Sequence, residues 1–135
     1  MTPGPAEAPD DRSAWWRSLG AAVAGFLVYG GWAYYVNADH GQSIGMRSGL
    51  LQGSYSFVLT LVTTLLMERL YRTFAAGQHP VVLTVIVTGV LLFTIPCVIH
   101  GLAGTPEILM TVLPGFLIGM VYTTVYTMSL SRLLS

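Results

Sequence analysis

Charged residues are scarce in this sequence. Its 135 residues include only 6 basic and 6 acidic side chains, which make up 9% of the chain, and every basic residue is an arginine. A soluble globular domain carries roughly 25% charged residues, so these few charges cannot cover a water-exposed surface. The net charge is zero, and a neutral chain creates no overall field that attracts nucleic acid. We therefore expect no nucleic-acid partner.

Cysteine is nearly absent, because Cys97 is the single thiol and lies inside an apolar run. One cysteine excludes an intrachain disulfide, a CxxC redox pair and a multi-thiolate metal site. The histidines show neither HxxxH nor HExxH spacing, and GxSxG and phosphate-binding motifs are also missing. The sequence therefore predicts no metal, no cofactor and no catalytic residue, and it argues against the common enzyme templates.

Apolar sequence is what the chain has in abundance. Hydrophobic residues make up 53% of the chain, and the mean hydropathy is +0.66. Four apolar runs without internal charges are each long enough to cross a hydrocarbon core of about 30 Å as a helix. The expected spans are residues 19–36, 48–67, 81–100 and 108–130. We therefore predict an all-α integral membrane protein, a four-transmembrane-helix bundle built from two helical hairpins.

The arginines predict how the spans are oriented. All but one of them fall on the same side of the membrane; that side holds Arg12, Arg17, Arg69, Arg72 and Arg132, and the other holds Arg47. Cytoplasmic loops carry an excess of basic residues, so we expect both termini in the cytoplasm. In a bacterium the protein would lie in the inner membrane, with residues 37–47 and 101–107 facing the periplasm.

The segment before the first span has a different composition. Residues 1–14 are rich in proline, alanine and acidic residues, so we expect a flexible cytosolic tail ahead of a four-helix domain at residues 15–135. A cleavable signal peptide is the competing interpretation of the first apolar run. That run is longer than the roughly 7–15 residues of a signal core, which favours a retained span.

Small and polar residues mark the faces that should pack inward, because lipid covers the outside of such a bundle. In the second span they recur every three or four positions, at Ser48, Gln52, Ser56, Thr60 and Thr63 or Thr64. Two GxxxG motifs, Gly49/Gly53 and Gly115/Gly119, allow close helix contact. These glycines could serve contacts within the bundle or a homodimer interface.

The expected non-cytoplasmic end gathers the residues with reactive side chains. We hypothesise a substrate-binding polar vestibule that opens outward, with candidate residues Arg47, Gln52, His100 and Glu107, and with Ser56 and Tyr122 deeper. The planar guanidinium of Arg47 suits a phosphate or carboxylate. In the competing interpretation Arg47 extends to lipid headgroups and Glu107 stabilises the positive end of the fourth span.

Three classes of function remain open. The first is a small oligomeric transporter, channel or lipid-handling protein that uses the polar stripe and the vestibule. The second is an accessory subunit of a larger membrane complex. The third is a membrane enzyme that acts on a lipid-linked substrate through His100, Glu107 and Arg47. The expected partners are membrane lipid and either further copies of the chain or a larger membrane-protein complex.

Overall fold

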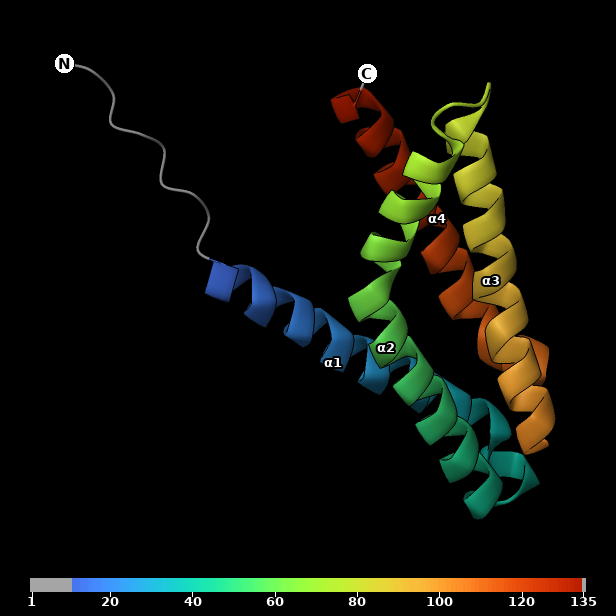
Figure 1. The fold of residues 1–135 in the computed structure, drawn as a ribbon. Helices are drawn as coiled ribbons and strands as arrows, with labels where there is room; N and C mark the ends of the chain where they lie inside the picture. The colour runs from blue at the N-terminus through green and yellow to red at the C-terminus, as the bar shows by residue number, and fades with distance from the viewer. Residues whose placement is uncertain (1–10, 135) are drawn as a thin grey trace.

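Four long helices form nearly all of the part of the chain that the computed structural model describes, residues 11–134, and no strand occurs within this range (Figure 1). They are α1 (Asp11–Asn37), α2 (Gln42–Phe74), α3 (Pro80–Ala103) and α4 (Ile108–Leu134), and the short 3-10 helix η1 (Ala38–His40) joins α1 to α2. Each long helix is apolar and long enough to cross a membrane. The prediction of an all-helical chain with four helices of membrane-spanning length is therefore confirmed.

The helices extend beyond the predicted apolar spans. α1 begins at Asp11, so residues 11–14 of the expected tail are helical, and the rest of that tail, residues 1–10, lies outside the described residues. α2 runs from Gln42 to Phe74, well past both ends of the expected span 48–67. An apolar run marks the stretch that suits hydrocarbon, whereas a helix can continue into neighbouring polar residues, as it does at both ends of α2.

Glycine and proline set the turns. Gly41, with φ of 126°, separates η1 from α2, and Gly104, with φ of 70°, ends α3. The N–H group of Thr105 then bonds to the carbonyl of His100 at 2.9 Å, as in a Schellman cap. Pro80 occupies the first turn of α3, where its missing N–H has no intrahelical partner to lose.

α1 and α2 form the most extensively packed pair of helices. A Cβ atom added to Gly30 would lie 2.8 Å from the carbonyl oxygen of Gly49, and one added to Gly53 would lie 2.9 Å from that of Phe26. The two backbones therefore touch directly and run antiparallel. α3 packs mainly on α4 and α2, so the chain consists of two helical hairpins.

α2 changes direction about midway along its length (Figure 1). In this region the hydroxyl of Thr60 donates to the carbonyl of Ser56 at 2.8 Å, and that of Thr63 donates to the carbonyl of Leu59. Such bonds to the preceding turn bend helices. As a result, the first half of α2 follows α1, and the second half lies farther from α1.

The side chains are distributed as expected for a protein in lipid. Most buried positions of α2 carry small or polar residues, among them Ser48, Gln52, Ser56 and Thr63, while large apolar residues such as Leu50, Val58 and Leu65 are exposed. This buried face of α2 coincides with much of the polar stripe that the residue spacing predicts.

Candidate functional site

A cleft of about 390 Å³ lies between the helices. All four helices line it, and its walls are mostly apolar with uncharged polar groups among them. Along α2 it extends from Gln52 to Thr64, a rise of about 18 Å. Ligand sites in proteins typically measure about 300–1,000 Å³, so this cleft has the size for a small molecule or part of a lipid.

Three of the predicted substrate-binding residues, Gln52, Ser56 and Tyr122, line this cleft. The hydroxyl of Tyr122 on α4 lies 3.0 Å from that of Thr64 on α2, which links the two helices across one end of the cleft. Gln52 lies at the other end and is only 2% exposed. The structure therefore brings the predicted polar residues of the second and fourth spans together around one space.

His100 belongs to a buried network next to the cleft and is 1% exposed. Its Nε2 atom lies 2.8 Å from Oε1 of Gln52, and its Nδ1 atom lies 2.8 Å from the hydroxyl of Thr105. The hydroxyl of Ser48 donates to that of Thr105 at 3.3 Å. The network connects α2, α3 and the turn that follows α3, and Gln52 is its member at the cleft.

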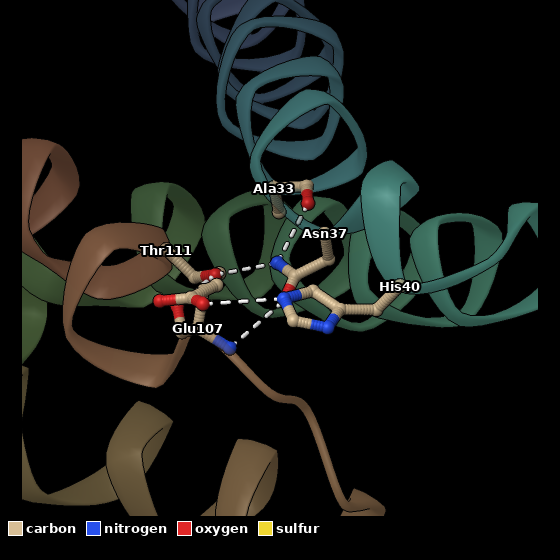
Figure 2. Close-up of polar contacts among 5 residues, drawn as sticks. All are labelled: Ala33, Asn37, His40, Glu107 and Thr111. Atoms are coloured by element: carbon tan, nitrogen blue, oxygen red, sulfur yellow. Dashed lines mark hydrogen bonds and ion pairs between the residues drawn. The ribbon is translucent and has the colours of Figure 1, made fainter.

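Glu107 belongs to a different cluster, between the end of α1 and the start of α4 (Figure 2). Its carboxylate oxygen Oε1 lies 3.2 Å from Nε2 of His40. The side chain of Asn37 is fully buried. Its amide nitrogen Nδ2 donates to the carbonyl oxygen of Ala33 at 2.8 Å and to the hydroxyl of Thr111 at 2.7 Å. Its amide oxygen Oδ1 accepts a hydrogen bond from the backbone N–H of Glu107 at 3.0 Å. This cluster joins the two hairpins at the end where the α1–α2 and α3–α4 turns lie.

Arg47 lies in neither cluster and does not line the cleft. Its side chain is exposed, and its Nη2 atom lies 3.8 Å from the position of a Cβ added to Gly104. Of the four residues expected in the vestibule, the structure therefore places Gln52 and His100 in one buried network, Glu107 in the cluster with His40, and Arg47 at the surface beside the α3–α4 turn.

Both GxxxG motifs face other helices of the same chain. A Cβ added to Gly49 would lie 2.9 Å from the carbonyl oxygen of Gly30 on α1, and one added to Gly119 would lie 3.1 Å from Leu92 on α3. Gly115 borders the cleft, where an added Cβ would lie 3.6 Å from Nε2 of Gln52. The glycines of α2 permit backbone contact, and those of α4 leave room for side chains.

The sequence analysis did not single out three residues that matter in the structure. Tyr29 and Tyr55 line the cleft, and Asn37 links the hairpins. The hydroxyl of Tyr55 is buried and has no hydrogen-bond partner in the described part of the chain. An amide at the end of an apolar run, as at Asn37, is a usable signal, because such a group needs partners when it is buried.

The described residues contain no group of three His, Cys, Asp or Glu side chains close enough to hold a metal ion. Comparison with known proteins adds no assignment. No protein-family model, no curated protein and no solved structure matches this chain.

Proposed function

We propose that this chain is a small lipid-handling transport protein that binds an amphipathic molecule of the membrane in the cleft between its helices. The observation that supports this proposal is a cleft with uncharged polar groups along the part of α2 that we place in the hydrocarbon core. On α2 the charged residues Arg47 and Glu68 lie about 31 Å apart along the helix, close to the roughly 30 Å thickness of that core. The cleft segment, Gln52 to Thr64, lies between them.

Polar side chains at this depth are costly unless they serve a partner or a pathway. The cleft holds several of them together with apolar and aromatic walls, and no charged side chain lines it. A charged ligand in such a cleft would lose its hydration without gaining an opposite charge. The lining therefore suits a molecule with an apolar body and an uncharged polar group.

The proposal includes an orientation and an assembly. We place both termini in the cytoplasm and the protein in the inner (cytoplasmic) membrane, because Arg69 and Arg72 lie near the end of α2 and Arg132 lies in the last turn of α4, whereas Arg47 lies at the opposite end. We also propose a homo-oligomer, because the cleft is only partly enclosed by one copy.

A lipid-movement assay tests this function. The purified chain is reconstituted into vesicles that contain a fluorescent glycolipid with an uncharged headgroup, and the loss of fluorescence is followed after a membrane-impermeant quencher is added. We expect quenching beyond the outer leaflet. Gly115→Ile should slow it by filling the cleft, whereas Leu117→Phe should not, because Leu117 is 54% exposed on the outer face of the same helix.

Vesicles with the protein that quench no further than empty vesicles would contradict the proposal. The same result would favour the alternatives, an accessory subunit of a larger complex or an enzyme on a lipid-linked substrate. Neither of these requires the purified chain to move lipid.

A further inference from the structure

Gln52 presents one of its two amide atoms to the cleft. Its Oε1 atom is occupied by His100 at 2.8 Å, while its Nε2 atom lies 3.6 Å from the position of a Cβ added to Gly115, on the cleft wall. No residue in the described range 11–134 accepts a hydrogen bond from this nitrogen. The nitrogen is therefore an N–H donor left open at the cleft wall, where a ligand that carries an acceptor can contact it.

The neighbouring hydrogen bonds fix which atom faces the cleft. The oxygen of Gln52 can only accept, so Nε2 of His100 must carry a hydrogen. In the neutral imidazole Nδ1 then accepts, and the hydroxyl of Thr105 donates to it at 2.8 Å. The hydroxyl of Ser48 donates in turn to Thr105. All donors point along the chain from Ser48 to Gln52, and with this tautomer of His100 rotation of the amide would place two N–H donors against each other.

We propose that the cleft binds an uncharged carbonyl oxygen of a membrane amphiphile at the amide nitrogen of Gln52, with His100 and Thr105 as positioning residues that hold the amide in place. This inference rests on the proposed function, because the ligand occupies the same cleft. Apolar residues such as Leu92 and Phe116 line the cleft and would contact the body of the ligand. A carbonyl accepts hydrogen bonds and donates none, which matches what Gln52 offers.

The test compares two probes that differ in the carbonyl alone. Binding of a long-chain methyl ketone and of the matching alkane to the full chain in nanodiscs is measured by calorimetry. We expect the wild type to prefer the ketone about tenfold, the effect of one hydrogen bond of about 1.4 kcal/mol. Gln52→Met, which has a similar shape and no N–H group, should bind both probes equally.

The positioning role has its own readout. In Thr105→Val, Nδ1 of His100 loses its donor, so His100 can carry its hydrogen on Nδ1 and accept through Nε2. The amide of Gln52 can then turn its oxygen toward the cleft. The preference for the ketone should fall, and a long-chain alcohol, which can donate a hydrogen bond, should bind more tightly than it does to the wild type. Thr105→Ser keeps the hydroxyl and should retain the wild-type order of affinities.

The carbonyl stretching band of a ¹³C-labelled ketone gives a measurement in the wild type itself. Hydrogen bonding lowers this frequency, so a bound ketone with the frequency of a free one would overturn the inference. A full ketone preference in Gln52→Met would do the same. Lipid movement that Gly115→Ile still slows would leave the proposed function standing in either case. A quinone and a diacylglycerol, tested in parallel, distinguish the two membrane sources of the carbonyl.

Discussion

The side-chain oxygen of Asn37, in the last turn of α1, accepts a hydrogen bond from the backbone N–H of Glu107 at 3.0 Å, although 70 positions separate the two residues (Figure 2). α4 starts from Glu107, whose carbonyl accepts from the N–H of Thr111. Helix starts leave N–H groups without intrahelical partners, and a side chain of the same helix usually binds them. Here a side chain from another helix does so, which fixes α4 against α1.

Substitution of Asn37 should therefore destabilise the fold. Asn37→Ala removes the partner of the Glu107 N–H and leaves Thr111 without its amide contact, so we expect a loss of about 1–3 kcal/mol in the free energy of unfolding. Unfolding in mixed detergent micelles measures it. Asp39→Ala, at an exposed neighbouring position, should change the value by no more than about 0.5 kcal/mol. Equal stability of Asn37→Ala and the wild type would contradict this assignment.

The ion pair in the same cluster should contribute less. The side chains of His40 and Glu107 are 43% and 46% exposed, so water screens their attraction, and such pairs contribute about 0.2–1 kcal/mol. A double-mutant cycle with His40→Ala and Glu107→Gln, followed by the same unfolding measurement, gives the coupling energy. A coupling larger than the effect of Asn37→Ala would show that the exposed pair, and not the buried amide, holds the hairpins together.

The close contact between α1 and α2 predicts that two glycines respond in opposite ways to alanine. A Cβ at Gly49 would lie 2.9 Å from a backbone oxygen of α1, whereas one at Gly31 would meet no atom within 4 Å. A backbone cannot move aside as a side chain can, so Gly49→Ala should cost about 1–3 kcal/mol. Gly31→Ala should be neutral or stabilise the helix by about 0.5–1 kcal/mol. Similar unfolding midpoints for both variants would refute this close packing.

The number and type of the helices could be predicted from the sequence, because four apolar runs leave the backbone no other way to satisfy its hydrogen bonds in lipid. The helix ends could not. α2 continues to Phe74 because the polar residues after its apolar run are compatible with a helix, and hydropathy does not report where a helix stops. The polar stripe of α2 was predictable, since spacing along one helix determines which residues share a face.

Contacts between the hairpins had no comparable signal. The pairing of Glu107 with His40, and of His100 with Gln52, depends on how the hairpins dock, and sequence separation carries no information about that. Arg47 and Glu107 carry opposite charges, and the sequence analysis placed both in one vestibule at the same end of the bundle. The turn at Gly104 instead places Arg47 beside the backbone and leaves Glu107 to His40.

The orientation of the chain gives a prediction that cysteine labelling can check. In a Cys97→Ser background, single cysteines are introduced at Gln78, in the turn between α2 and α3, and at Gln42, at the start of α2; both positions are exposed. Arg69 and Arg72 lie near the end of α2 that precedes Gln78. Cytoplasmic loops carry an excess of basic residues, so we expect Gln78 on the cytoplasmic side. A membrane-impermeant maleimide added to intact cells should therefore label Gln42→Cys and leave Gln78→Cys unlabelled until the cells are opened. The reverse pattern would contradict the proposed orientation and place the Gln52 end of the cleft on the cytoplasmic side.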